Sequence, residues 1–435
     1  MSNSPAKVLL NPPFRAEHVG SLIRPKPLFD KRCELEKGKC SLDDLKEAES
    51  DAVKHVVELQ RSLGIKSITD GEVKKASFYD GVFEKLDGMV FMPARPINEF
   101  KRYLPHIAML YAAGVPSDAT FYCNGKIKRT KPFYVEEFKA IKSVVPPEEV
   151  KNIKINMCPP SWWHHRHGSD LAYDLNVYKN DDEFFDDLGV AYRAEFRELY
   201  ELGCRNIQLD DPTFAFFCYE PTVSGMREAG VDPEKLLDTY IRSINVCTQG
   251  RPSDLRVGLH MCRGNYKGLH FCEGGYDPIA EKVFVGLDVD TLYLEFDDER
   301  SGSFDPLKYI PLNKMVVLGL VTSKNPKLEH MDDLKRRVDE AATAMSTDNP
   351  LRSKVTALNQ LCISPQCGFA SVWQGNPITE EEEKKKLALI DARNGVASSS
   401  LEARGVSFPG LVHYPPPNSG YLIDLQGLCL QPLQR

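Results

Sequence analysis

The sequence predicts an α/β protein, most simply a (β/α)8 barrel, from two observations. Short apolar, β-branched segments alternate with amphipathic helical segments along most of the 435 residues, and the apolar segments end in polar residues. Such alternation is typical of a parallel sheet covered by helices, and polar residues at strand ends are typical of the catalytic face of a barrel. A doubly wound open sheet is the alternative. The sequence contains no G-x-G-x-x-G or G-x-x-x-x-G-K-[ST] motif to support nucleotide binding.

Expected strands and helices follow each other in a regular order. The expected strands are IKSIT (65–69), IKINM (153–157), NIQLDD (206–211), RVGLHMC (256–262), TLYLEFD (291–297), MVVLGLV (315–321) and LCISPQC (361–367). The expected helices include residues 44–64, 191–204, 278–287 and 331–345, and one that ends in SINVCTQG (243–250).

Two parts of the chain depart from this pattern. The segment from about 90 to 150 contains FMPARP, AAGVPSD and SVVPPEE, and its prolines and glycines predict an insertion or a long irregular excursion. The tail at 401–435 is rich in proline and glycine and predicts an extended segment. We therefore expect a single catalytic domain across residues 1–435, with its core at about 14–400.

Composition argues against several classes of partner. The formal net charge is −7 and the sequence pI is about 5.9, so nothing favours nucleic acid or an anionic membrane as a partner. We expect no signal peptide and no membrane helix, because no window reaches the roughly 18 apolar residues that such a helix needs. Twelve scattered cysteines favour reduced thiols and a cytoplasmic location. The sequence does not indicate an oligomeric state.

A histidine, two cysteines and a glutamate stand at the carboxyl ends of expected strands. His260 and Cys262 lie two apart in one strand, so their side chains point to the same side. Glu295 ends the next strand and Cys367 follows a later one. A histidine and a cysteine two apart in a strand are more often a core cysteine beside a solvent-facing histidine. Cys367 alone is more often a small buried apolar residue. Together at successive strand ends, two thiolates, one imidazole and one carboxylate predict a zinc site.

The other ten cysteines are expected to be structural. Cys272, which lies close to His270, and Cys362 are the alternative ligands if one of the four is wrong. The predicted ligands do not form the close Cys-x-x-Cys pairs of a structural zinc finger, so a catalytic role is favoured.

Several ordered motifs between Phe14 and about Ile390 resemble the catalytic C-terminal half of cobalamin-independent methionine synthase, and more closely the short stand-alone members of that family. In chain order the motifs are HVGS (18–21) followed by RP, TDGE (69–72) followed by LDG, IQLDDP (207–212), HMC (260–262), LEF (294–296), GLVTSKNP (319–326) and SPQCG (364–368). The resemblance implies a (β/α)8 barrel with zinc on the four predicted ligands. It also implies that homocysteine joins the zinc as a thiolate and attacks a methyl group, a reaction consistent with the lowered pKa of a zinc-bound thiol.

The resemblance also implies an amino-acid subsite. Gly20 and Ser21 fall where backbone groups hold the amino acid, and Glu72 and Asp210 fall where carboxylates hold its ammonium group. Each has a structural alternative. The first two could form a turn, Glu72 could be a carboxylate at a helix N-terminus, and Asp210 could belong to a capped strand-to-helix turn with Asp211. Asp211 is a lesser candidate for substrate contact.

The sequence departs from the folate-dependent members at three points. Lys324-Asn325-Pro326 stands where those enzymes carry His-Ser-Pro, whose histidine is the proton donor, so Lys324 becomes the candidate catalytic residue. A lysine transfers a proton near pH 7 only if burial or a nearby cation lowers its pKa, and Lys324 could instead neutralise a carboxylate. Phe216 stands where an acidic pterin contact is expected, and the large N-terminal domain is missing. These differences weaken methyl-folate as the donor.

The segment PPSWWHHRHG (159–168) falls where the family positions the second substrate. One interpretation is a rim loop with exposed histidines. The other is an aromatic platform on which a flat or anionic donor stacks, with Trp162 as the candidate binding residue. Nothing in the spacing supports a second metal site.

The functional hypothesis is a zinc-dependent methyltransferase that converts homocysteine to methionine with 5-methyltetrahydrofolate or another methyl donor. Its alternative is a zinc-dependent thiol alkyltransferase or lyase of the same superfamily, which acts on another thiol or electrophile. A decarboxylase on a related barrel would need no zinc and would leave the four ligands unexplained. A zinc-stabilised binding protein is the non-catalytic alternative.

Overall fold

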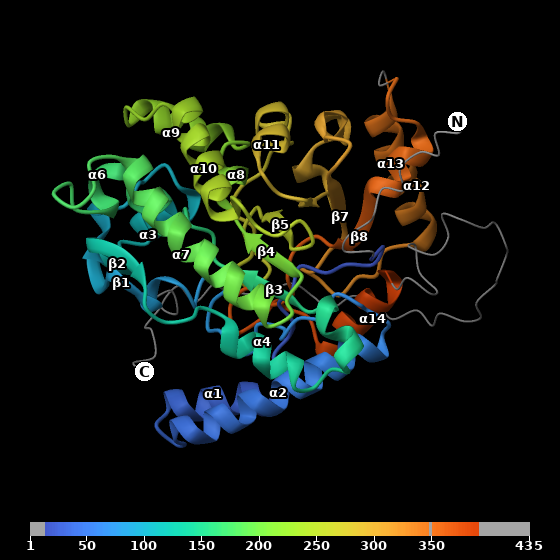
Figure 1. Cartoon of the computed structure of the whole chain (residues 1–435), viewed down its shortest axis with the longest axis horizontal. Helices are drawn as coiled ribbons and strands as arrows, with labels where there is room; N and C mark the ends of the chain where they lie inside the picture. The colour runs from blue at the N-terminus through green and yellow to red at the C-terminus, as the bar shows by residue number, and fades with distance from the viewer. Residues whose placement is uncertain (1–13, 348–349, 391–435) are drawn as a thin grey trace.

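The computed structural model describes residues 14–347 and 350–390. Its centre is a six-stranded parallel sheet in the order β3-β4-β5-β6-β7-β8 (Figure 1). The strands are β3 (Lys154–Met157), β4 (Asn206–Asp210), β5 (Arg256–Met261), β6 (Thr291–Glu295), β7 (Met315–Val321) and β8 (Leu361–Pro365). These six expected strands are confirmed. The expected tail at 401–435 lies outside the described residues.

Two further segments lie at the two edges of this sheet. Ala16 forms a parallel bridge with Ile363 of β8, and Ile68 forms one with Ile153 beside β3. The two segments also meet each other, because the Leu22 amide donates to the Gly71 carbonyl at 3.0 Å. The order around the sheet is therefore that of a (β/α)8 barrel, in which six positions are regular strands.

The expected strand at 65–69 is reduced to the single bridge at Ile68. The reason lies in the side chain of Gln60, whose Oε1 accepts from the Thr69 amide at 2.9 Å and whose Nε2 donates to the Thr69 carbonyl at 2.9 Å. Because one side chain takes both backbone groups, they are not available to a ladder with a neighbouring strand.

Helices surround the strands on the outside (Figure 1). Their bounds are α1 (Lys26–Glu36), α2 (Leu42–Ser62), α4 (Val135–Lys142), α7 (Asp181–Glu201), α9 (Glu220–Glu228), α10 (Pro233–Thr248), α11 (Ala280–Gly286), α12 (Met331–Ser346), α13 (Lys354–Gln360) and α14 (Glu380–Ile390). Local sequence starts the longer ones: Ser41 forms a capping box with Asp44, and the Asn180 side chain accepts from the Glu183 amide. The expected helices are confirmed.

The expected insertion is confirmed as an antiparallel pair, β1 (Leu86–Pro96) and β2 (Ser117–Arg129), with α3 (Pro105–Ala112) between them. It lies at one side of the barrel, near the short helices α5 (Trp162–His167) and α6 (Ser169–Ala172) (Figure 1). Buried Glu195 of α7 anchors it, because this carboxylate accepts from Arg129 and from the amides of Phe133 and Tyr134. The remaining short helix, α8 (Thr213–Phe216), follows β4.

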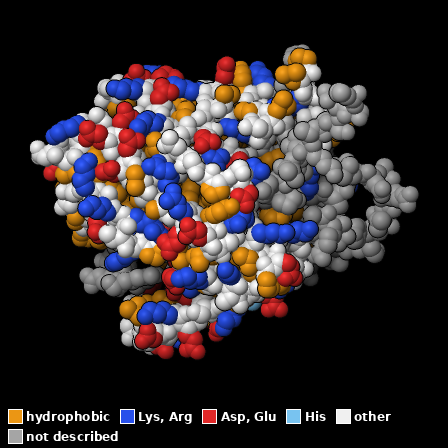
Figure 2. All heavy atoms as spheres, viewed as in Figure 1, with side chains coloured by type: hydrophobic (Ala, Val, Ile, Leu, Met, Phe, Trp, Pro, Cys, Tyr) orange, Lys and Arg blue, Asp and Glu red, His pale blue; other side chains and the backbone are white. Residues whose placement is uncertain are grey.

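The surface agrees with the charge balance of the sequence. Figure 2 shows Lys and Arg side chains interspersed with Asp and Glu over the face that it draws. Within the described residues, no helix is both long enough and apolar enough to cross a membrane.

A charged network inside the barrel joins the first segment to two strands. Lys154 of β3 lies 3.2 Å from Glu17, and the Tyr293 hydroxyl of β6 donates to the other Glu17 oxygen at 2.6 Å. All three side chains are buried. Burial raises the pKa of Glu17, but the Lys154 charge, together with the His18 charge and nearby hydrogen bonds, holds the pKa below its ordinary value. Burial also lowers the pKa of the neighbouring His18 to about 4.

This network generates a stability prediction. Lys154→Met leaves the Glu17 carboxylate buried without its cation, so the free energy of unfolding should fall by about 3–5 kcal/mol. The double variant Glu17→Gln/Lys154→Met removes both charges and should be more stable than the single variant. Urea denaturation of both proteins measures the difference. A single variant as stable as the wild type would show that the pair is not charged in the folded state.

Candidate active site

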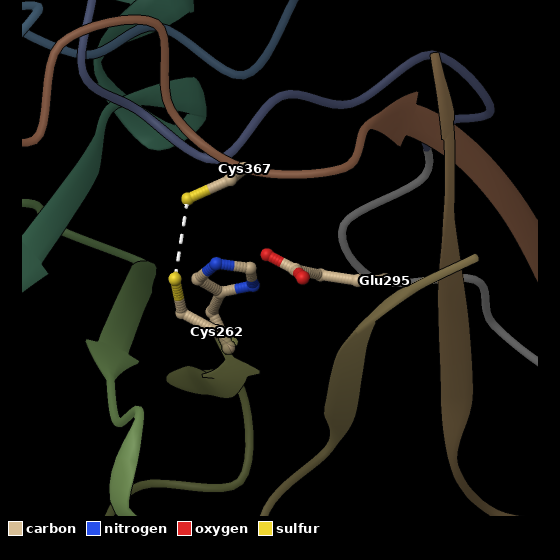
Figure 3. A group of neighbouring side chains, drawn as sticks. Cys262, Glu295 and Cys367 are labelled. Carbon is tan, nitrogen blue, oxygen red and sulfur yellow. Dashed lines mark hydrogen bonds between the residues drawn. The ribbon is translucent and has the colours of Figure 1, made fainter. Parts of the chain in front are cut away.

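Four side chains from three strand ends converge at one edge of the sheet. His260 lies in β5 and Cys262 directly after it, Glu295 ends β6, and Cys367 lies two residues after β8. One potential ligand atom from each lies within 4.8 Å of the others, and the two Sγ atoms are 3.4 Å apart. Figure 3 shows Cys262, Glu295 and Cys367 pointing toward one another. The structure therefore brings the four predicted ligands together.

Three residues of this cluster are buried and Cys262 is half-buried, and their donor atoms fit a metal ion. Among the described residues, neither ring nitrogen of His260 and neither carboxylate oxygen of Glu295 has a hydrogen-bond partner, although the two side chains are 2% and 0% exposed; the Arg300 guanidinium lies 3.8 Å from the Glu295 carboxylate. Burial of such groups without partners is costly unless a cation compensates it. Burial also raises the pKa of Glu295 to about 7. A set of one nitrogen, two sulfurs and a carboxylate is a transition-metal donor set.

The residues around the cluster hold it in shape. The Arg263 guanidinium donates to the Tyr276 hydroxyl at 2.7 Å, and that hydroxyl accepts from the Glu295 amide at 2.9 Å. The Gly264 amide donates to the Cys262 sulfur at 3.2 Å. These contacts fix the end of β6 relative to the loop that carries Cys262. Second contacts of this kind commonly orient metal ligands.

The two alternative cysteine ligands lie elsewhere. The Cys272 thiol donates to the Arg263 carbonyl at 3.6 Å and belongs to an apolar cluster with Phe100. Cys362 packs with Tyr293, Met315 and Val317. Burial raises the pKa of the Cys362 thiol to about 12. Neither thiol belongs to the group of side chains that converge on the candidate metal centre.

Gly20 and Ser21 lie against the loop that follows Cys367. The Phe369 amide donates to the Ser21 carbonyl at 2.9 Å, and the Ala370 amide lies 3.4 Å from the Ser21 hydroxyl. Gly20 has φ +132°, and a Cβ added there would lie 2.4 Å from the Asn156 amide group. Glycine is therefore required at this position by both conformation and space.

Glu72 and Asp210 are both buried and face polar partners. The Lys75 ammonium donates to Glu72 at 2.8 Å, while Asp210 accepts from Asn156 at 2.9 Å and from Gln208 at 2.6 Å. Burial raises the pKa of both carboxyls, to about 7 for Glu72, and the Asp210 charge contributes to the rise at Glu72. The two carboxylates are thus close enough to interact electrostatically.

The structural alternatives for Glu72 and for the turn at Asp210 and Asp211 have different outcomes. Glu72 lies in a turn with φ +54° and not at a helix N-terminus, so the helix-dipole alternative is wrong. Asp211 does make a local turn contact, because its Oδ1 accepts from the Thr213 amide at 2.8 Å. Burial raises the pKa of Asp211 to about 6. The interpretation as a strand-to-helix turn therefore applies to Asp211, although it does not cap the helix, and Asp210 faces the polar interior.

Lys324 lies in the loop after β7 and reaches the loop after β5. Its ammonium donates to the Gly264 carbonyl at 2.9 Å and to the Asn265 side-chain oxygen at 3.3 Å. The Lys324 charge opposes the rise in the pKa of Glu295 that burial causes. A positive charge therefore stands beside the cluster of potential anionic ligands.

The expectation of a rim loop with exposed histidines at 159–168 is wrong. Residues 162–167 form the helix α5, and every side chain in it is buried. Trp162 stacks on Tyr79, with ring centroids 5.1 Å apart, and contacts His165 at 4.9 Å. Arg166 is paired with Asp118, so its charge is directed at this carboxylate and away from an anionic ligand.

The three histidines of α5 have separate surroundings, so they do not assemble a second metal site. His164 contacts Asp181 at 3.0 Å, and His167 contacts the Thr120 hydroxyl at 2.7 Å. His165 packs on Phe216, which also stacks on His106, with ring centroids 5.7 and 6.0 Å apart. Burial lowers the pKa of His106 to about 3 and that of His165 well below its ordinary value, so this face carries neutral imidazoles.

Several residues of the site had not been predicted. They are Lys75, His106, Asn156, Gln208, Arg263 and Asn265, which contact predicted site residues or line the same edge of the sheet. Three of them had a signal in the sequence: Arg263 directly follows the HMC motif, Gln208 lies within IQLDDP, and Asn156 lies in the expected strand at 153–157.

Comparisons with known proteins agree with the family resemblance of the sequence motifs. The family model of the cobalamin-independent synthase catalytic domain matches residues 176–380. The uncharacterized protein YxjG of Bacillus subtilis is 36% identical over 389 residues, which are 88% of this chain and 95% of that protein. The methionine synthase of Sulfolobus acidocaldarius is 26% identical over 379 residues, which are 85% of this chain and 93% of that enzyme.

Two solved structures share the fold over almost their whole length. A Listeria monocytogenes protein assigned as a vitamin-B12 independent methionine synthase has a TM-score of 0.65 and 29% identity, and the match covers 90% of this chain and 99% of that one. A B12-independent methionine synthase from Shewanella in complex with selenomethionine has a TM-score of 0.61 and 17% identity, over 88% of this chain and 97% of that one.

The fold and the four-ligand cluster define a barrel protein with a candidate metal centre at the carboxyl ends of its strands. Similarity in sequence and in structure identifies the family of this barrel protein. The chain belongs to the cobalamin-independent methionine synthase family.

The cluster generates a prediction on metal content. The purified protein should hold about one transition-metal ion per chain, and Cys367→Ser should lose most of it because one of four ligands is removed. Cys362→Ser is the matched control, since this buried cysteine of β8 lies outside the cluster. Elemental analysis by mass spectrometry measures the metal. Equal metal content in wild type and Cys367→Ser would contradict the assignment.

Proposed function

We propose that this protein is a zinc-dependent methyltransferase that takes homocysteine as the thiol substrate and produces methionine. The observation that carries the proposal is the convergence of His260, Cys262, Glu295 and Cys367 in a member of this family. Zinc is the ion that best suits two thiolates, an imidazole and a carboxylate. When bound, it lowers the pKa of a thiol that joins it and so provides a nucleophile near pH 7.

The amino-acid end of homocysteine is proposed to lie on Gly20, Ser21, Glu72 and Asp210. The two buried carboxylates suit an ammonium group, because charge-assisted hydrogen bonds are strong where water is excluded. The Shewanella relative was solved with selenomethionine, which is an analogue of the proposed product. Ser21 contacts the loop after Cys367, and Asp210 pairs with His260 in the sheet, which supports a subsite beside the metal.

Lys324 is proposed to act in the methyl-transfer step. Its ammonium lies beside three potential anionic ligands, where a positive charge offsets the negative charge that a substrate thiolate adds. Its hydrogen bonds to Gly264 and Asn265 would fix its position during the step.

The methyl donor is proposed to bind on the side of α5, where Trp162 supplies an aromatic surface. The family resemblance implies 5-methyltetrahydrofolate. Phe216 and the neutral imidazoles beside it make this side less polar than it would be with an acidic residue at position 216. Arg166 forms an ion pair with Asp118. These features favour a donor that needs neither an acidic contact nor a free arginine at this wall.

The reaction itself gives the first prediction of this section. The zinc-loaded protein should convert homocysteine to methionine with a methylated donor, and mass spectrometry of the amino acid measures the product. Methyl-folate, methyl-cobalamin and their analogues are compared in parallel, with Cys367→Ser as the inactive control. Formation of a different thioether, or no product with any donor, would contradict the proposed reaction.

A second prediction concerns the pH dependence of homocysteine binding. The Glu72 pKa is about 7, and an ammonium group binds the ionised carboxylate, so the KM for homocysteine should rise as the pH falls below about 7. Glu72→Gln should raise KM about tenfold or more and remove this pH dependence. Steady-state kinetics between pH 6 and 8 measure both effects. An unchanged KM in Glu72→Gln would remove this residue from the subsite.

A further inference from the structure

Arg24 is a buried arginine that the proposed reaction leaves without a role. Its side chain is 4% exposed, and its guanidinium donates four hydrogen bonds, all to backbone carbonyls. Nη1 donates to Leu22 at 3.1 Å and Ala370 at 2.8 Å, and Nη2 donates to Glu72 at 2.7 Å and Lys75 at 2.9 Å. A guanidinium suits this arrangement, because its planar fork presents several donors in fixed directions.

These four carbonyls belong to three different loops of the barrel edge. The first loop carries Gly20 and Ser21, the second carries Glu72, and the third follows Cys367. The first two loops lie in the first 80 residues and are about 50 residues apart, and the third lies near residue 370. No contact between sequence neighbours therefore holds the three loops together. Arg24 joins the amino-acid subsite to the loop of one metal ligand.

The backbone of Glu72 shows why such a tie is needed. A φ of +54° is unfavourable for a residue that has a Cβ, and it persists only where the surroundings hold it. The Glu72 carbonyl accepts from Arg24 and from the Lys75 amide at 3.0 Å, and its own amide donates to Asp70 at 2.9 Å. These bonds set the direction in which the carboxylate leaves the backbone.

We infer that Arg24 is a positioning residue of the amino-acid subsite, which holds the Glu72 carboxylate and the Gly20–Ser21 turn in register with the Cys367 loop. The inference rests on the proposed function, because it assumes that homocysteine binds between these loops. It assigns Arg24 an effect on substrate affinity, while the four metal ligands stay in place without it.

The test compares Arg24→Lys and Arg24→Gln with the wild type in the full zinc-loaded chain. Lysine keeps the charge but cannot reach four carbonyls in one plane, so neither variant should bind homocysteine well. Calorimetry should show homocysteine affinity reduced about tenfold or more, as expected when hydrogen bonds of a charged group are lost. The kcat should change much less than KM, and zinc content should stay at that of the wild type.

Arg352→Lys is the matched control. Arg352 is also buried, at 2% exposed, and also donates to backbone carbonyls, those of Met345 and Ile310, but it touches none of the three loops. It should lower thermal stability without changing the KM for homocysteine. This control separates a general cost of losing a buried guanidinium from an effect on the subsite.

A second measurement needs no variant. In the wild type, homocysteine should slow hydrogen exchange at the amides of Leu22 and Lys75, which donate to the carbonyls of Gly71 and Glu72. Wild-type affinity in Arg24→Lys, or no change in exchange at these amides when homocysteine binds, would overturn the role of Arg24. Failure of the zinc-loaded wild type to bind homocysteine at all would instead overturn the proposed function.

Discussion

The burial of His260, Glu295 and Cys367, with half-buried Cys262 beside them, is the constraint on which the rest of this site depends. His260 and Glu295 are nearly inaccessible and lack hydrogen-bond partners among the described residues, and two thiols lie 3.4 Å apart beside them. Such a cluster is costly unless a cation occupies it. The parallel pairing of β5 with β6, and of β7 with β8, produces the cluster, because parallel strands end at the same edge of a sheet.

Three of the four residues proposed to hold the amino acid, Gly20, Ser21 and Glu72, lie in the two segments that do not form regular strands. Side chains take over backbone hydrogen bonds there: Gln60 holds Thr69, and Asn156 holds the carbonyl of Val19. Irregular backbone leaves the turns at 20–21 and 70–75 free to adopt conformations that a ladder would forbid, including the positive φ of Glu72. The proposed substrate contacts and the irregular backbone therefore occur at the same positions, as is common for loops on a rigid scaffold.

The sequence alone determined a large part of this protein. The alternation of apolar and amphipathic segments predicted six strands and the main helices, because each element must bury an apolar face. The spacing of His260 and Cys262, with Glu295 and Cys367 at later strand ends, predicted the metal cluster, since strand periodicity and parallel pairing leave little freedom in where such side chains point. Ordered motifs identified the family.

Tertiary structure alone decided the environment of these residues. The burial of α5 could not be predicted, because its aromatic and basic side chains find partners such as Tyr79 and Asp118 far away in the sequence. The local sequence around 65–69 favoured a strand, and only the contact with Gln60 of α2 replaces the ladder there. Arg24 lay beside a recognised motif, but its four acceptors come from three loops. Sequence patterns report local backbone preference and burial, whereas hydrogen bonds between distant segments exist only once the chain has folded.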